Sequence, residues 1–180
     1  YIDFDGVYRC SKVWLNGHLL GFRPNGYISF RYDMTPYLKY GQEENVLVVQ
    51  ANNSQQPNSR WYSGSGIYRN VWLVKTGQVH VDQYGANITT PDVAQERATV
   101  MIETTLKNTY AAAVTAELTT IIKAPSGKVI AHTSLSVELP ENGSDIIKQT
   151  LEVKAPELWG IKNPALYTAV TEVRSGNQLT

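Results

Sequence analysis

The sequence predicts an all-β protein made of two successive β-sandwiches. Apolar and polar residues alternate with period two along most of the 180 residues, which is typical of half-buried strands, and helical periodicity is almost absent. Turn residues such as Asn16-Gly17 and Ser126-Gly127 separate the candidate strands. The composition also shifts at residues 75–77, where tyrosine, tryptophan and glycine give way to threonine, alanine and valine.

The first half is predicted to contain short strands and one helical turn. Residues 12–20 are a hairpin candidate, because Asn16-Gly17 supplies the positive φ angles of a type I′ turn. Thr35 and Pro36 predict a short helical turn, with Thr35 as the cap and Pro36 at the first helical position. Further strands are expected at residues 1–4, 27–32, 45–50 and 67–74.

The second half is a succession of strands. The alternation in residues 99–107 places Val100, Ile102 and Leu106 on one face. Further strands are expected at residues 114–122, 129–139, 146–153 and 166–174. Roughly seven short strands over about one hundred residues are typical of an immunoglobulin-like sandwich. The Cys…Trp…Cys pattern of antibody-type domains is missing.

We therefore predict two domains, residues 1–76 and residues 77–180, joined by a very short linker. The first is expected to be a partial jelly-roll sandwich. A jelly roll needs about eight strands in two sheets, more than this stretch supplies. We accordingly expect the front of this domain to lie outside the chain, and residues 1–4 to form an edge that its neighbours would cover.

Composition excludes several classes of function. The 16 basic and 16 acidic residues balance, and no basic face for nucleic acid stands out. No apolar run reaches membrane-spanning length. The single cysteine, Cys10, excludes an internal disulfide framework and is expected to be a small core or half-exposed residue. His18, His80 and His132 lie far apart and are interpreted as surface histidines, so neither a metal site nor a cofactor is predicted.

No catalytic group is predicted within the chain. The carboxylates lie mostly in turns or at exposed strand positions, without the desolvating aromatic neighbours that would raise the pKa of a general acid. Gly64-Ser65-Gly66 lacks the lysine and the strand–loop–helix context of a phosphate loop, and is interpreted as a turn.

The candidate binding residues lie in the polar loop from Gln55 to Gly66. Asn58, Arg60, Trp61 and Tyr62 combine aromatic rings, which can cover the apolar C–H face of a sugar, with donors for its hydroxyl groups. The alternative is that Trp61 is an interface plug against a neighbouring domain. Trp14 and Trp72 are interpreted as core residues, and Trp159, in a proline-bounded loop, as interface or packing.

Three motifs in order resemble glycoside hydrolase family 2: DFDGVYRCSKVWLNGHLLGFRPNGYISFRYDMTPYL, NSRWYSGSGIYRNVWL and APELWGIKNPALYTAVTEV. The resemblance implies a modular enzyme with a sugar-binding jelly roll, an immunoglobulin-like domain and a TIM barrel that carries two catalytic glutamates and acts with retention. The barrel would follow residue 180, so this chain would be non-catalytic. The implied partners are a β-linked glycoside and the downstream barrel, while homo-oligomerisation stays open.

The resemblance is nearest in style to β-galactosidases, and the loop matching residues 55–66 would reach the barrel's active-site mouth and help shape the substrate pocket. Some family members place a carboxylate in this loop, contacting sugar or a bound cation. Residues 55–66 contain no Asp or Glu, so no metal site is carried over. Arg60 stands near that place and would suit a uronic acid, which keeps β-glucuronidase specificity as an alternative.

Two further alternatives are an autonomous carbohydrate-binding module and a structural β-sandwich module. The compartment is also open, since a single cysteine is compatible with bacterial cytoplasm or periplasm.

Overall fold

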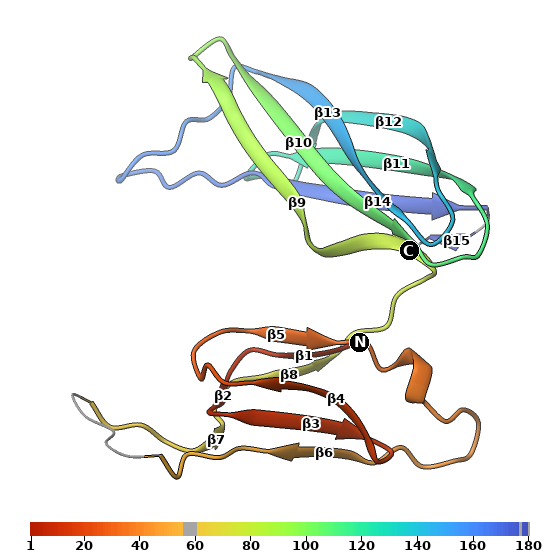
Figure 1. Cartoon of the computed structure of the whole chain (residues 1–180). Coiled ribbons are helices and arrows are strands. Elements are labelled where there is room, and N and C mark those ends of the chain that lie inside the picture. The colour runs from red at the N-terminus through yellow and green to blue at the C-terminus, as the bar shows by residue number, and fades with distance from the viewer. Residues whose placement is uncertain (56–60, 177, 180) are drawn as a thin grey trace. The chain divides into compact units, whose positions relative to one another are not determined.

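The computed structural model describes residues 1–55, 61–176, 178 and 179. Regular structure in this part of the chain is β-strand apart from one 3₁₀ turn, which confirms the all-β prediction (Figure 1). None of the described helical structure has the length and apolarity needed to cross a membrane. The chain divides into two compact units, residues 1–75 and 76–180.

The described elements of the first unit are short. They are β1 (Ile2–Phe4), β2 (Val7–Tyr8), β3 (Ser11–Leu15), β4 (His18–Arg23), β5 (Phe30–Tyr32), η1 (Thr35–Tyr37), β6 (Leu47–Gln50), β7 (Gly66–Ile67) and β8 (Val71–Leu73). The strands pair in the orders β5-β1-β8 and β4-β3-β6, and β2 pairs with β7. These pairings are antiparallel.

The core of the first unit lies between the two three-stranded sheets, which form two layers (Figure 1). Alternation along β3 buries Val13 and Leu15 on the same face. Phe4 of β1 is fully buried and stacks on Phe30 of β5, with ring centroids 5.0 Å apart. The buried cluster consists of Ile2, Phe4, Val7, Val13, Leu15, Phe30 and Met34.

The predicted turns of the first unit are confirmed in part. Asn16 and Gly17 both have positive φ, 50° and 86°, and close the β3–β4 hairpin. Pro36 lies in the first turn of η1 as predicted, but the prediction of Thr35 as the cap was wrong. Met34 occupies the cap position, and the carboxylate of Asp33 instead accepts a 2.9 Å hydrogen bond from the Thr35 N–H.

The second unit is an immunoglobulin-like sandwich. Its described strands are β9 (Val79–Val93), β10 (Arg97–Asn108), β11 (Val114–Lys123), β12 (Val129–Leu139), β13 (Ser144–Lys154), β14 (Thr168–Ser175) and β15 (Gln178–Leu179). They form one sheet in the order β13-β10-β9 and another in the order β12-β11-β14-β15. The predicted face of Val100, Ile102 and Leu106 is buried. Strand β9 was not predicted, because most of its side chains are exposed and do not alternate.

A buried polar pair joins the two sheets of this sandwich. Thr120 of β11 donates a 2.6 Å hydrogen bond to Oε1 of Gln149 on β13, and Nε2 of Gln149 lies 3.4 Å from the carbonyl oxygen of Leu118. Both side chains are buried. Buried polar groups are tolerated only when they are paired, so these two residues stabilise the sandwich as a pair.

Replacing Gln149 with alanine is expected to lower the free energy of unfolding by about 1–3 kcal/mol, because the buried Thr120 hydroxyl loses its acceptor. Chemical denaturation measures the change. Gln95→Ala is the matched control, since Gln95 is exposed between β9 and β10. Equal losses in the two variants would contradict the stabilising role of the pair.

Two interpretations of single residues were wrong. His80 is buried, with 4% of its surface exposed, and its Nδ1 lies 2.9 Å from the carbonyl oxygen of Gly77. It follows Val79 at the start of β9, the one part of that strand that enters the core. Trp72 is 53% exposed rather than core, because it pairs with Asp3 on the face of the sheet opposite the buried Ile2 and Phe4, and its Nε1–H donates to Asp5.

Candidate functional site

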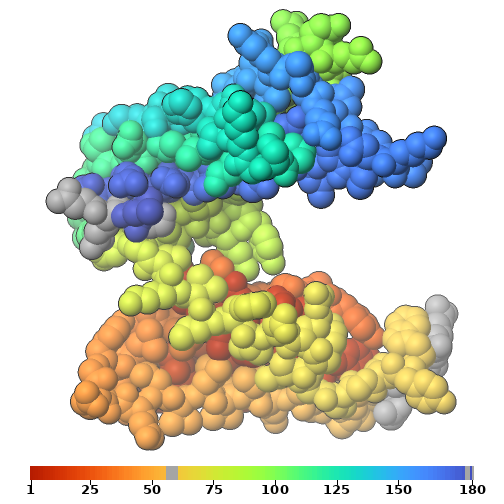
Figure 2. Space-filling view, turned by 180° about the vertical axis from the view of Figure 1, so that it is seen from behind, coloured from red at the N-terminus to blue at the C-terminus, as the bar shows by residue number. Residues whose placement is uncertain are grey.

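The first unit carries a small hollow lined mostly by aromatic rings, which we call the aromatic cup. Its volume is about 210 Å³. The lining residues are Tyr8, Tyr27, Trp61, Tyr62, Ser63, Gly64 and Tyr68. They come from three separate stretches of the first unit, so the cup exists only in the folded chain. The described residues 61–65 protrude at the edge of this unit (Figure 2).

The short ladder of β2 and β7 holds one side of the cup. Tyr8 pairs with Gly66, and Val7 pairs with Ile67. Gly66 has φ of 101°, in the region that favours glycine, and this turns the chain from the loop into β7. The Asn53 side chain also donates a 3.0 Å hydrogen bond to the Ser65 hydroxyl, which joins the two ends of the loop. These contacts thus fix the backbone positions from which the aromatic side chains of the cup extend.

Two hydrogen bonds connect this loop to the segment between β4 and β5. The indole Nε1–H of Trp61 donates to the phenolic oxygen of Tyr27 at 2.8 Å. The Tyr68 hydroxyl donates to the carbonyl oxygen of Gly26 at 2.7 Å. The Tyr27 ring also packs at a tilt of 60° on Tyr8, with centroids 5.3 Å apart. Four aromatic residues of the cup are therefore mutually restrained.

Two glycines make room for tyrosine rings of the cup. A Cβ atom at Gly26 would overlap the ring of Tyr8, and a Cβ atom at Gly6 would overlap the ring of Tyr68. The backbone at both positions lies directly against an aromatic ring, an approach that a side chain would prevent.

The electrostatics of the cup are those of neutral hydrogen-bonding groups. The hydrogen bond from Trp61 lowers the pKa of Tyr27 below its ordinary value, with smaller contributions from Ser63, Tyr8 and the charge of Arg9. The Arg9 guanidinium lies 5.9 Å from the Tyr8 ring centroid and donates to the carbonyl oxygen of Gln55. The lining residues themselves are tyrosine, tryptophan, serine and glycine, none of which is charged near neutral pH.

The predicted site residues divide into two groups. Trp61 and Tyr62 both line the cup, and both are exposed. Asn58 and Arg60 lie outside the described residues. Sequence reasoning missed Tyr8, Tyr27 and Tyr68, which the fold brings beside Trp61. The available signal was the richness in tyrosine and glycine before residue 75, which does not reveal which tyrosines meet.

A metal centre is not found in the described part of the chain. Within residues 1–55, 61–176, 178 and 179, no three His, Cys, Asp or Glu side chains are close enough to hold a metal ion. Cys10 is a free, half-buried thiol.

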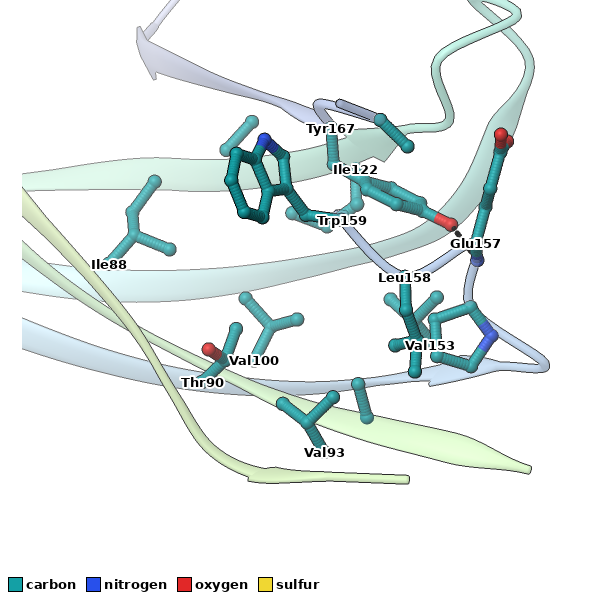
Figure 3. Close-up of a pocket in the computed structure, with 14 residues that line it drawn as sticks. Ile88, Thr90, Val93, Val100, Ile122, Val153, Glu157, Leu158, Trp159 and Tyr167 are labelled. Atoms are coloured by element: carbon teal, nitrogen blue, oxygen red, sulfur yellow. Dashed lines mark hydrogen bonds between the residues drawn. The ribbon is translucent and has the colours of Figure 1, made fainter. Parts of the chain in front are cut away.

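A second hollow, of about 300 Å³, opens in the second unit beside the loop between β13 and β14 (Figure 3). It continues the core, since Val100 and Ile122 belong to both. Trp159 stands at its side, and the Tyr167 hydroxyl accepts a 2.7 Å hydrogen bond from the Glu157 N–H. Its lining is mainly aliphatic, with Thr90, Glu157 and Tyr167 as polar residues, whereas the cup is lined by aromatic rings and by the hydroxyl groups of tyrosine and serine. The aromatic cup is the better candidate for a sugar.

Family models match nearly the whole chain. The model of glycosyl hydrolases family 2, sugar binding domain, matches residues 1–77, and that of glycosyl hydrolases family 2 matches residues 79–180. The chain belongs to glycosyl hydrolases family 2. This confirms the resemblance seen in the sequence motifs, and it places the aromatic cup in the part that matches the sugar-binding model of the family.

Relatives within glycosyl hydrolases family 2 differ in the sugar they are named for. A β-galactosidase of Bacteroides ovatus is 48% identical over 172 residues, which cover 96% of this chain and 20% of that protein. Solved structures include a family member from Bacteroides cellulosilyticus, with TM-score 0.93, 32% identity and coverage of 99% of this chain and 24% of that one. The structure of a β-glucuronidase of Bacteroides uniformis has a TM-score of 0.89 and 28% identity. The match covers 99% of this chain and 23% of that one.

The chain thus spans between a fifth and a quarter of the length of these glycosyl hydrolases family 2 proteins.

Proposed function

We propose that the chain is a non-catalytic front part of a longer glycoside hydrolase, and that the whole protein is a retaining β-galactosidase that removes terminal β-linked galactose. In this proposal residues 1–76 are the sugar-binding jelly-roll domain and residues 77–180 the immunoglobulin-like domain. A downstream TIM barrel of the same polypeptide supplies the catalytic carboxylates. The observation that carries the proposal is an aromatic cup located in the part that matches a sugar-binding family model.

The cup has the chemistry to bind one face of a sugar. Trp61 and Tyr62 offer exposed ring faces, which cover the apolar C–H groups of a pyranose. Asn58 and Arg60 of the same loop add donors for hydroxyl groups. The volume of about 210 Å³ falls below the 300–1,000 Å³ that is usual for a pocket enclosing a whole ligand. Loop 55–66 therefore serves as one wall of a substrate pocket, and the downstream domain provides the remainder.

A neutral sugar fits the described part of the cup better than a uronic acid. Its lining residues include no lysine, arginine or histidine, and a carboxylate needs a cation or several donors to leave water. The 48% identity to a protein named as a β-galactosidase supports the same choice. The second candidate is β-glucuronidase specificity. It is favoured by the similarity to the β-glucuronidase of Bacteroides uniformis and by the presence of Arg60 in the loop.

The intact protein that carries this chain is expected to hydrolyse one aryl β-D-glycoside selectively, with galactoside preferred. The assay compares galactoside, glucuronide, mannoside and glucoside, with the 180-residue chain as the inert control. Preference for the glucuronide would replace the proposed β-galactosidase specificity by β-glucuronidase specificity. Absence of hydrolysis from the folded intact protein would overturn the enzymatic proposal. In that case, a change in tryptophan fluorescence on adding millimolar sugar would identify an autonomous carbohydrate-binding module instead.

A further inference from the structure

Trp61 is a large aromatic side chain with little packing around it. Its exposed fraction is 62%, so van der Waals contacts leave much of the ring free to turn. The hydrogen bond from its Nε1–H to the Tyr27 phenolic oxygen, at 2.8 Å, is directional and fixes the edge of the ring. The hydrogen bond to Tyr27 is therefore a main determinant of the orientation of the Trp61 ring.

Tyr27 is also exposed, at 56%, but it is held at its backbone and on one face of its ring. Its backbone N–H donates a 2.8 Å hydrogen bond to the side-chain oxygen of Asn25. Its ring rests on Tyr8, which is buried. The carbonyl of the preceding residue, Gly26, accepts a hydrogen bond from Tyr68. The backbone and one ring face of Tyr27 are thus restrained, and its phenolic oxygen is the acceptor to which the Trp61 indole is attached.

We propose that Tyr27 is a positioning residue that orients the Trp61 ring to stack on the sugar. This rests on the proposed function of the aromatic cup and deepens it. A ring that is already oriented loses less side-chain entropy when the sugar arrives, so the hydrogen bond strengthens binding without touching the substrate. Tyr27 would affect substrate binding and not bond cleavage, because in the proposed function the reacting groups belong to another domain.

Tyr27→Phe in the intact protein tests this, because it removes the hydroxyl group and keeps the ring that packs on Tyr8. We expect KM for the preferred aryl glycoside to rise roughly 3- to 10-fold, with kcat changed less than about twofold. A second readout is the ¹⁹F resonance of Trp61 in protein labelled with 5-fluorotryptophan, identified by its absence in Trp61→Phe. This resonance is expected to shift and to broaden in Tyr27→Phe.

Tyr40→Phe is the matched control, since Tyr40 belongs to the same unit, is exposed, and lies outside the cup. It is expected to leave both KM and the Trp61 resonance unchanged. An unchanged Trp61 resonance in Tyr27→Phe overturns the positioning role, and this measurement requires no turnover. A shifted resonance with unchanged KM also overturns it.

Trp61→Ala distinguishes the failure of this inference from the failure of the proposed function. If Trp61→Ala raises KM and Tyr27→Phe does not, the cup binds substrate but Tyr27 does not position its main ring. If Trp61→Ala leaves KM unchanged in an active enzyme, the cup does not contact the substrate, and both the pocket role of loop 55–66 and the role of Tyr27 are overturned.

Discussion

Replacing Trp61 with alanine in the intact protein is expected to lower kcat/KM for the preferred glycoside about 10- to 100-fold, equivalent to roughly 1.4–2.8 kcal/mol. Residues that dominate a binding surface cost about 2 kcal/mol or more when truncated, and tryptophan is among the types most enriched there. Because Trp61 is largely exposed, the free energy of unfolding should fall by less than about 1.5 kcal/mol. Steady-state kinetics and chemical denaturation measure the two effects separately.

Trp159→Ala is the control for this experiment. Trp159 has the same exposed fraction as Trp61, 62%, but lies in the second unit beside the apolar hollow. A loss of kcat/KM confined to Trp61→Ala would tie the effect to the cup. Equal losses in the two variants would indicate a general effect of removing a large exposed ring, and would contradict a substrate contact at Trp61.

Replacing Phe4 with alanine is expected to lower the free energy of unfolding of the first unit by about 3–5 kcal/mol. Phe4 is fully buried between the two sheets and stacks on Phe30, so the variant loses the transfer free energy of the ring and leaves a cavity behind. The change is a large part of the 5–15 kcal/mol that typically stabilises a domain. In the 180-residue chain, tryptophan fluorescence during thermal unfolding reports mainly on this unit, which holds three of the four tryptophans of that chain, Trp14, Trp61 and Trp72.

Tyr40→Ala serves as the comparison for Phe4→Ala, because it removes an exposed aromatic ring from the same unit. Its effect on stability is expected to stay within about 0.5 kcal/mol. A loss below about 1 kcal/mol for Phe4→Ala would mean that the space between the two sheets closes around the missing ring.

The fold followed from the sequence where the signals are local. Strand β10 alternates between buried and less buried positions along its length, and its period of two was visible before any coordinates. The Asn16-Gly17 turn was equally readable, since few residues other than glycine and asparagine adopt positive φ readily. In both cases the residues that determine the structure lie next to one another in the chain.

Two of the errors concern edge strands. Trp72 was interpreted as core because it alternates with apolar residues, but it pairs with Asp3 and lies on the face of the sheet opposite the buried Ile2 and Phe4. Strand β9 also lies at the edge of its sheet, and a mostly exposed strand has no apolar alternation to detect. Whether a strand is central or marginal depends on pairing partners far away in sequence, which composition does not encode.

The candidate site was predicted in the same uneven way. Trp61 and Tyr62 could be predicted as candidate binding residues because large aromatic side chains are unusual in a polar loop. Tyr27, which accepts the hydrogen bond from Trp61, lies 34 residues away in the chain, and nothing in its local pattern marks it. The local sequence indicated the candidate stretch, whereas the partners that restrain it are seen only in the folded arrangement.

Gly6 and Gly26 have a consequence for how this family should be compared across species. Each lets a tyrosine ring approach the backbone closely, so each shapes the cup without contributing a side chain to it. A homologue with alanine at position 26 would have to move the Tyr8 ring, even if it kept every aromatic residue of the cup. A homologue with phenylalanine in place of tyrosine and with both glycines would keep the apolar wall of the cup. Under the proposed function, substrate preference would therefore diverge by gain or loss of a single methyl group at a position that does not contact the sugar.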